Sequence, residues 1–216
     1  MRRAALLCLG LVAAAIAAPA AHAAGFSATS TPLPADMRKA MIGVSWHKGC
    51  PVGLGQLRLI TATHHTPDGG TATGRIIVNK SVAGTVQVIL RRLWDLDYPI
   101  TRMQPVDAYG GDDWKSIEDD NTSSFNCRAA TGSSNWSNHA YGYAIDLNPL
   151  ENPYIENGRV FHKASQRYID RTKRRSPLQV LPGDRVVRVF YAEGWGWGGD
   201  WTGGVLDTQH FSVNGR

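Results

Sequence analysis

The stretch SNHAYGYAIDLNP, residues 137–149, places a histidine and an aspartate seven positions apart around a single glycine. On a helix, seven residues rise about 10 Å, or two whole turns. On a strand they span about 23 Å, and the two side chains lie on opposite faces. His139 and Asp146 can therefore reach one metal ion only if the chain folds back between them. Gly142 is the position where such a bend costs least, because glycine accepts backbone angles that other residues avoid.

The N-terminal residues 1–23 have the pattern of a secretory signal peptide. A short basic start precedes an apolar run over residues 4–18 and the small-x-small cleavage signal AHA at 21–23. The apolar run is short and rich in alanine, which disfavours a membrane span. We therefore expect a secreted, extracellular protein. Its residues 24–44 would form a flexible lead-in, and residues 45–216 would form one domain.

The chain that follows this segment is weakly basic. Removing 23 of the 216 residues leaves 193, which suits one domain with a real core. Of the 23 Lys and Arg residues, two lie in the removed segment, so 21 remain against 18 Asp and Glu, a net charge of +3. This charge suits association with an anionic surface such as a bacterial cell wall, and equally suits an ordinary soluble protein. No dense basic run indicates nucleic-acid binding.

Two cysteines, Cys50 and Cys127, remain after cleavage. In an exported protein they most simply form one disulfide, which would close a long loop and stabilise the fold by about 2–4 kcal/mol. The alternative is a metal-binding pair, His47-x-x-Cys50, which an oxidising compartment disfavours.

The hydrophobic periodicity predicts both strands and helices. Alternation predicts strands at 56–63 and 73–79, joined by the turn PDGG. Apolar residues at helical spacing predict a helix over 81–96 with Ser81 as its N-cap, and Asp184 begins a shorter helix that ends before Gly194. Further expected segments are a strand over 100–106, a long loop over 107–136 and a final strand over 210–213. Because strands and helices do not alternate regularly, the fold class is α+β.

A second pair of candidate ligands lies near the end of the chain, in LDTQHFSV, residues 206–213. Asp207 and His210 are three positions apart and can converge in a tight turn. Together with His139 and Asp146 they supply two histidines and two carboxylates. Two histidines and one carboxylate make a catalytic zinc set with one position left for water, and the other carboxylate can take the proton of that water. Spacing alone also allows the ordinary alternative, in which these side chains are solvated in polar loops.

Two motifs follow each other in a specific order. The first reads S-x-H-x-x-G-x-A-x-D over residues 137–146, and the second reads W-G-G-x-W followed by D-x-x-H over residues 197–210. This pattern resembles the bacterial zinc peptidases of the D-alanyl-D-alanine carboxypeptidase and L-alanyl-D-glutamate endopeptidase family. NTSSFNCR, residues 121–128, and AIDLNPLENPY, residues 144–154, resemble the secreted, actinobacterial-type members. The resemblance covers about residues 45–213.

The resemblance implies both a fold and a metal centre. The fold would be the α+β hedgehog/DD-peptidase fold, an antiparallel sheet with helices packed on one side. His139, Asp146 and His210 would be the zinc ligands. Asp207 would be the general base, where other branches of the family carry Glu. Nickel or cobalt would also fit these ligands.

The resemblance also implies two substrate-contacting residues. Arg128 would bind the substrate and stabilise developing negative charge, and Ser137 would lie near the substrate. A planar guanidinium suits a carboxylate, and peptidoglycan stem peptides carry carboxylates beside their scissile bonds. Asn138 departs from the family, since many relatives carry an acidic residue there. A Cys50–Cys127 bridge would brace the loop that carries Arg128.

The implied function is that of a secreted zinc metallopeptidase which hydrolyses peptidoglycan stem peptides with zinc-activated water. Arg128 suits a carboxypeptidase and an endopeptidase alike, so the bond cleaved stays open. The alternative is a non-catalytic wall-binding protein that retains a structural zinc site. A base at Asp207 favours the enzyme. We expect stem peptides as the partner, a monomer, no nucleic acid and no transmembrane span in the mature chain.

Other conspicuous residues have more ordinary interpretations. His64 and His65 are expected at the surface, because neighbours on a strand point to opposite faces and chelate poorly. The basic run RTKRR, residues 171–175, is expected as a solvated loop, with docking to anionic wall polymers as the alternative. Three tryptophans are expected in the core or the cleft wall, with stacking on sugar rings as the alternative: Trp195, Trp197 and Trp201.

Overall fold

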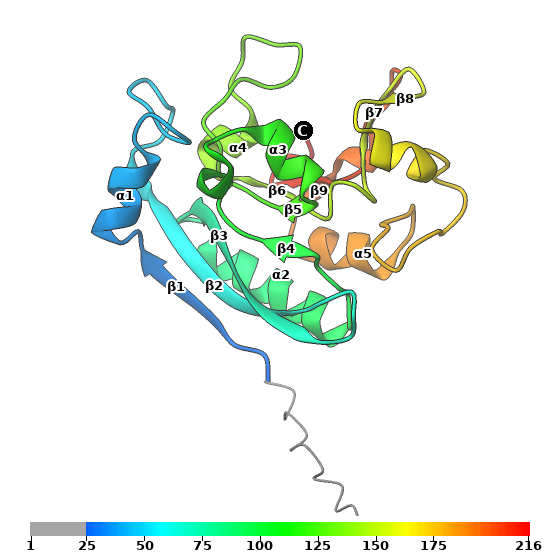
Figure 1. The fold of residues 1–216 in the computed structure, drawn as a ribbon, viewed down its shortest axis with the longest axis horizontal. Coiled ribbons are helices and arrows are strands. Elements are labelled where there is room, and N and C mark those ends of the chain that lie inside the picture. Colours follow the sequence, from blue (N-terminus) through cyan, green and yellow to red (C-terminus); the bar gives the residue numbers. More distant parts are fainter. Residues whose placement is uncertain (1–24) are drawn as a thin grey trace, which may run out of the picture.

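The computed structural model describes residues 25–216, so the predicted signal peptide lies outside the described residues (Figure 1). The described chain combines helices with small, mostly antiparallel sheets, which confirms the α+β class. No helix among residues 25–216 is long and apolar enough to cross a membrane.

The largest sheet contains three antiparallel strands in the order β1-β2-β3. These strands are β1 (Ala28–Pro32), β2 (Leu57–His65) and β3 (Thr71–Asn79). The strands β2 and β3 agree with the alternation in the sequence, and pair in the register Leu59 to Ile77 and Ile60 to Ile76. Both faces of the sheet are therefore covered, since side chains that alternate along each strand enter two different hydrophobic clusters.

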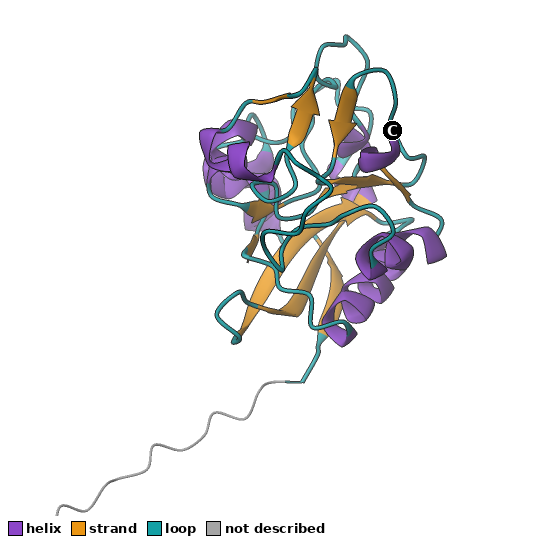
Figure 2. Ribbon diagram, turned by 90° about the vertical axis from the view of Figure 1, so that its right-hand side faces the viewer, coloured by secondary structure: helices purple, strands orange, loops and turns teal. Residues whose placement is uncertain are grey.

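The larger cluster lies on the face of the sheet that carries α2 (Ala83–Asp95) and α5 (Arg185–Ala192). Figure 2 shows helices beside the sheet. Ile60 and Ile76 belong to this cluster, together with Val86 of α2 and Phe190 of α5. The smaller cluster lies on the opposite face, where Ile77 packs with apolar residues from α1 (Ala35–Met41) and from the disulfide region. Helices therefore cover more than one side of the molecule, in contrast to the expected one-sided arrangement.

The N-terminal residues of the described chain are folded, which corrects the expected flexible lead-in. β1 pairs with β2 from Ala28 opposite Ala62 to Pro32 opposite Arg58. The side chains of β1 are nearly all exposed, so this edge strand is held by main-chain hydrogen bonds and leaves little hydrophobic pattern in the sequence. Leu33, directly after β1, is buried in the smaller cluster.

The helix α2 begins two residues later than expected. Ser81 is not its N-cap, because the Asn79 side chain accepts hydrogen bonds from both Ser81 N (3.1 Å) and Ser81 Oγ (3.0 Å). Val82 precedes the first helical residue instead. The second expected helix, α5, starts after Asp184 as predicted, and Gly194 follows it with a positive φ of 77°.

The remaining strands form short sheets instead of extending the first one. One sheet has the order β6-β11-β9, another has the order β10-β7-β8, and β4 pairs with β5 in parallel. The bounds are β4 (Arg102–Met103), β5 (Asn121–Thr122), β6 (Ala144–Asp146), β7 (Tyr154–Glu156), β8 (Arg159–Val160), β9 (Gly196–Trp197), β10 (Val205–Asp207) and β11 (His210–Ser212). The expected strand over 100–106 is thus reduced to β4.

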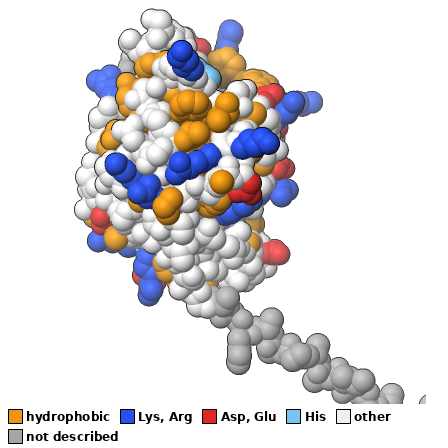
Figure 3. All heavy atoms as spheres, turned by 90° about the vertical axis from the view of Figure 1, so that its left-hand side faces the viewer, with side chains coloured by type: hydrophobic (Ala, Val, Ile, Leu, Met, Phe, Trp, Pro, Cys, Tyr) orange, Lys and Arg blue, Asp and Glu red, His pale blue; other side chains and the backbone are white. Residues whose placement is uncertain are grey.

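The segment 107–136, expected as a long loop, contains short regular elements. The helix α3 (Asp113–Glu118) begins at the N-cap Asp112, whose carboxylate accepts a hydrogen bond from Lys115 N at 3.1 Å. The other short helices of the fold are α4 (Asn138–Tyr141) and the 3-10 turns η1 (Leu54–Gln56), η2 (Val106–Tyr109), η3 (Lys163–Tyr168) and η4 (Gly198–Asp200). On the face of the molecule that includes α1 and β1, Lys and Arg side chains alternate with apolar ones (Figure 3).

Candidate metal and substrate site

The chain folds back within residues 137–146, as the spacing of His139 and Asp146 predicts. Ser137 is the N-cap of α4, and its Oγ accepts a hydrogen bond from His139 N at 3.3 Å. The single turn of α4 ends at Gly142, which has a φ of 70°, and β6 begins two residues later. This turn places the histidine and the aspartate on the same side of the bend.

Gly142 also lies against the end of β3. Its carbonyl accepts a hydrogen bond from Asn79 N at 3.0 Å. A Cβ at this position would lie 2.6 Å from Asn79 N and 3.1 Å from Val78 C. Both the positive φ and this close approach require glycine here.

The strands β6 and β11 bring the distant ligand candidates together. They pair antiparallel in a register that places His210 directly opposite Asp146. His210 Nδ1 lies 3.1 Å from Asp146 Oδ1, and His139 Nε2 lies 3.2 Å from Asp146 Oδ2. The ligand atoms of these three buried residues all lie within 4.8 Å of one another, the arrangement expected for one metal ion.

The hydrogen bonds on the far side of each ring support metal binding. His139 Nδ1 donates to the Ser124 carbonyl at 2.6 Å, and His210 Nε2 donates to a main-chain oxygen of Arg216 at 3.0 Å. These bonds place a proton on the far nitrogen of each ring, so that His139 Nε2 and His210 Nδ1, which lie 3.1 Å apart, are the nitrogens that can offer lone pairs to a metal. Two facing lone pairs beside a carboxylate repel unless a cation lies between them, so this donor set fits Zn²⁺.

Charge interactions among these groups shift their pKa values in opposite directions. Burial by itself raises the pKa of Asp146, but the two histidines lower it to below the ordinary range. Burial is the largest single effect on His210 and lowers its pKa, but its hydrogen bond to Asp146 and the negative charges of Asp146 and Asp207 together outweigh burial and raise the pKa above the usual value. Asp146 is therefore an ionised carboxylate, as a metal ligand must be.

Asp207 lies at the end of β10, beside the cluster. The strand pairs with β7 so that Asp207 is opposite Tyr154. Gly198 lies against the main chain of Asp207, and a Cβ there would overlap the Asp207 carbonyl oxygen, so glycine allows this approach. Burial, and then the charge of Asp146, raise the pKa of Asp207 to about 7. Its Oδ1 is buried without a hydrogen-bond partner among the described residues.

Arg128 lies near the same site, but its guanidinium is engaged by α3. Arg128 Nη2 forms an ion pair with Asp113 Oδ2 at 2.8 Å. The Arg128 carbonyl accepts from Ser137 N at 3.1 Å, which ties the arginine to the start of the motif. The sequence pattern did not indicate a role for Asp113, because its helix is only six residues long and lies in a segment that was expected to be a loop. The N-cap Asp112 was the one local signal of this helix.

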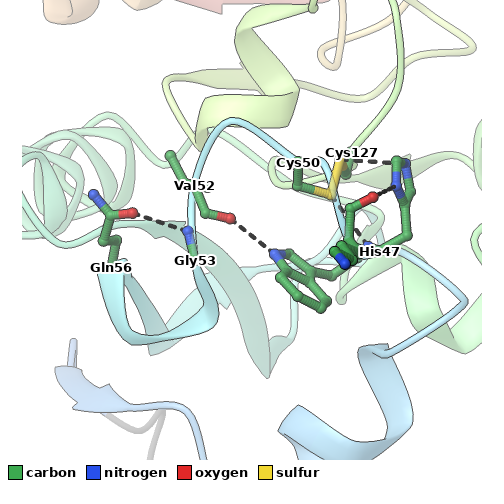
Figure 4. Close-up of a disulfide and its surroundings, with 8 residues drawn as sticks. His47, Cys50, Val52, Gly53, Gln56 and Cys127 are labelled. Atoms are coloured by element: carbon green, nitrogen blue, oxygen red, sulfur yellow. Dashed lines mark hydrogen bonds between the residues drawn. A yellow bond between two sulfur atoms is a disulfide. The ribbon is translucent and has the colours of Figure 1, made fainter.

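The predicted disulfide between Cys50 and Cys127 is present (Figure 4). Cys127 N also donates to Ser45 O at 2.9 Å, so the residue before Arg128 is anchored twice. His47 lies close to the bridge, with Nε2 3.5 Å from Cys127 Sγ. Because both sulfur atoms are committed to the bridge, the His47-x-x-Cys50 metal pair is not formed in this state.

One histidine expectation needs correction. His64 is buried, with 5% of its surface exposed, because β2 directs it into the fold, whereas it was expected at the surface. In the basic run, residues 172–175 are exposed, as expected of a solvated loop, and Arg171 alone is partly buried, where it donates to main-chain oxygens of Glu151, Tyr168 and Val180.

The tryptophans divide into two groups. Trp195 and Trp197 are buried in the larger cluster, as the core interpretation predicts, with 3% and 2% of their surface exposed. Trp197 Nε1 donates to Thr208 O at 2.9 Å and thereby fixes the turn between Asp207 and His210. Trp201 is partly buried and lines a cavity together with His139 and His210, so it forms part of the cleft wall.

Two adjacent cavities open around these residues. The metal cavity, about 410 Å³, is lined by His139, His210 and Ser137. A second cavity of about 370 Å³, which we name the α3 cavity, is lined by residues of α3 and of the segment 149–162. Four residues line both cavities: Arg128, Thr131, Tyr154 and Asp207. The arrangement suits an extended ligand that passes Arg128 and Asp207 on its way from one cavity to the other.

One comparison with known proteins gives a match. Residues 131–213 match a protein family described as D-alanyl-D-alanine carboxypeptidase. No curated protein and no solved structure matches the chain. The family match supports a peptidase of this kind, and it includes Ser137, His139, Asp146, Asp207 and His210. Arg128 and the disulfide lie before the matched segment.

Proposed function

We propose that this protein is a secreted zinc metallopeptidase that hydrolyses stem peptides of peptidoglycan, as a D-alanyl-D-alanine carboxypeptidase or an L-alanyl-D-glutamate endopeptidase, on a hedgehog/DD-peptidase fold. The observation that carries the proposal is the buried group His139, Asp146 and His210. Its ligand atoms converge, and the other nitrogen of each histidine is committed to a main-chain oxygen. These three residues would hold the zinc.

Zinc bound by these residues would supply a Lewis acid that lowers the pKa of a water molecule and polarises the peptide carbonyl. Asp207 is the general base in this proposal. It lines the metal cavity, and its Oδ1 is free to accept the proton of the attacking water. The same carboxyl group then returns the proton to the leaving amine, so that no charge accumulates on the amine.

Arg128 binds the substrate carboxylate and stabilises negative charge near the scissile bond. Its guanidinium lines both cavities and already pairs with one carboxylate, that of Asp113. Ser137 lines the metal cavity and orients α4 through its capping hydrogen bond. The disulfide restricts the backbone next to Arg128, which limits the reorganisation needed when the substrate binds.

The cell-wall location rests on three observations. The N-terminal residues have a signal-peptide pattern, a disulfide is formed, and the chain that remains carries a net positive charge. The face that includes α1 carries cationic side chains suited to anionic wall polymers (Figure 3).

A digest of defined peptidoglycan fragments tests the proposal. The purified protein is incubated with disaccharide-peptides of known stem sequence, with and without a metal chelator, and the products are read by mass spectrometry. Asp207→Asn should abolish cleavage, whereas Asp200→Asn, a nearby exposed aspartate that lines neither cavity, should not. Loss of one alanine indicates the carboxypeptidase, and a cut between L-Ala and D-Glu indicates the endopeptidase. Zinc binding without any product would instead support a non-catalytic wall-binding protein.

A further inference from the structure

The α3 cavity has an apolar lining that comes from two segments. Trp114 and Ile117 belong to α3, and Tyr154 and Phe161 belong to the segment 154–161. Trp114 and Phe161 remain 49% and 54% exposed although each contacts one aromatic neighbour, so apolar surface stays open to a ligand. We name this apolar part of the cavity the slot, and it can accept an aliphatic side chain.

Several polar atoms of the residues that line this cavity have no hydrogen-bond partner among the described residues. Four of its lining residues have a buried polar atom without a hydrogen bond among residues 25–216: Arg128 Nε, His162 Nδ1, Asp207 Oδ1 and Gln209 Oε1. Buried polar groups in folded proteins are normally hydrogen-bonded. Their concentration at one cavity indicates that a ligand supplies the missing partners there. An acceptor is needed at Arg128 and a donor at Gln209, which a carboxylate and an amide N–H would provide.

The aromatic geometry favours a peptide over a sugar. Trp114 lies against His162 with ring centroids 3.8 Å apart and the ring planes tilted by 35°, and Phe161 packs on Tyr154 with centroids 5.9 Å apart. Sugar rings bind on flat and open aromatic faces, and one face of Trp114 is already occupied by His162. An aliphatic side chain needs only apolar contact on either side, which the slot offers.

We propose that the α3 cavity is a second substrate subsite, which binds an aliphatic side chain of the peptide on the side of Arg128 away from the metal cavity. The proposal rests on the peptidase function above and names a further element of its substrate. Arg128 holds the carboxylate of one residue, and the neighbouring residue places its side chain between Trp114 and Phe161. These two residues then determine which peptides bind.

Two synthetic stem peptides test the subsite. They share the scissile bond and the carboxylate, and they carry either glycine or leucine at the position predicted to enter the α3 cavity. The purified protein should show a KM about ten-fold lower for the leucine peptide and a similar kcat for both, because burial of a leucine side chain strengthens binding without acting on the reacting bond.

The variants Trp114→Ala and Phe161→Ala should each remove this preference, while Tyr191→Ala, an exposed aromatic residue of α5 that lines neither cavity, should retain it. Kd values for the same peptides, measured by calorimetry on chelator-treated protein, separate binding from catalysis. A leucine preference in Kd that depends on Trp114 supports the subsite even if no peptide is cleaved, in which case only the peptidase proposal fails.

Equal KM and Kd values for the two peptides would overturn the subsite and leave the peptidase proposal intact if cleavage continues. Retention of the preference in both variants would overturn it as well. A preference for disaccharide-linked over free peptides that disappears in Trp114→Ala would assign the cavity to the glycan, and would also overturn the proposal.

Discussion

The substitution Gly142→Ala tests whether the bend in the metal-binding segment depends on its contact with β3. Two costs add at this position. An alanine with a φ of 70° is in the left-handed region, which costs about 1–2 kcal/mol. Its Cβ would also lie 2.6 Å from Asn79 N, and relief of such an overlap with backbone costs about a further 1–3 kcal/mol. The free energy of unfolding should therefore fall by about 2–5 kcal/mol.

Gly194→Ala is a matched control for the first of these costs. Gly194 has a φ of 77°, and a Cβ there would have no atom within 4 Å. The free energy of unfolding of Gly194→Ala should fall by only about 1–2 kcal/mol, since the left-handed backbone conformation is the single cost of this substitution. Urea denaturation followed by circular dichroism gives both values.

Zinc affinity provides a second measurement on the same pair of variants. Relief of the overlap at Gly142 moves the backbone between His139 and Asp146, so that zinc affinity in competition with a chromophoric chelator should fall about ten-fold, a loss typical of groups that orient ligands. Gly194→Ala should bind zinc as the unaltered protein does. Equal losses of stability in the two variants, together with equal zinc affinities, would refute the inference that the bend at Gly142 depends on its close contact with β3.

Three further predictions concern the disulfide, a buried acid and the arginine. Replacing Cys50 and Cys127 together by serine should lower the free energy of unfolding by about 4 kcal/mol in urea denaturation, because the bridge joins residues 77 positions apart; a loss below about 1 kcal/mol would contradict the loop-entropy account. Burial, and to a lesser degree a neighbouring carboxyl group, raise the pKa of Glu151 from 4.5 to about 7, so its contribution to stability is present below pH 4.5 and lost as the pH rises through 7. Stability should therefore decline between about pH 4.5 and 7 by less than about 1.4 kcal/mol per pH unit, since solvent screens this partly exposed group, and Glu151→Gln should remove this part of the decline. Asp113→Asn should lower KM by at most about five-fold for substrates that carry the carboxylate, because Arg128 no longer pairs with Asp113, and should leave KM unchanged for an amidated substrate.

The candidate site was more predictable than the fold around it. The bend at Gly142 and the convergence of His139 with Asp146 follow from a residue spacing that no straight element satisfies. The pairing of His210 with Asp146 depends on a strand register between residues 64 positions apart; the types of residue allowed it, and the resemblance to a family favoured it. The metal roles of these residues stay predictions until the ion is measured.

The elements that escaped prediction lack a local hydrophobic signal. β1 exposes most of its side chains and is defined by hydrogen bonds to β2, which lies about 30 residues away in the sequence. The helix α3 is too short for a helical period to be seen. His64 is buried because distant segments pack against β2, and the alternating pattern of the strand does not predict that burial. In each case, tertiary contacts decide the structure.

The pairing of β6 with β11 makes the metal centre sensitive to errors of strand alignment. A shift by one residue would turn the His210 side chain to the opposite face of the sheet and remove it from Asp146. Misaligned chains would thus retain two of the three ligands and bind metal weakly. Metal binding would favour the correct alignment during folding, because only that alignment offers the complete site. The ion would act in this way as a check on the alignment of β11, before any substrate is met.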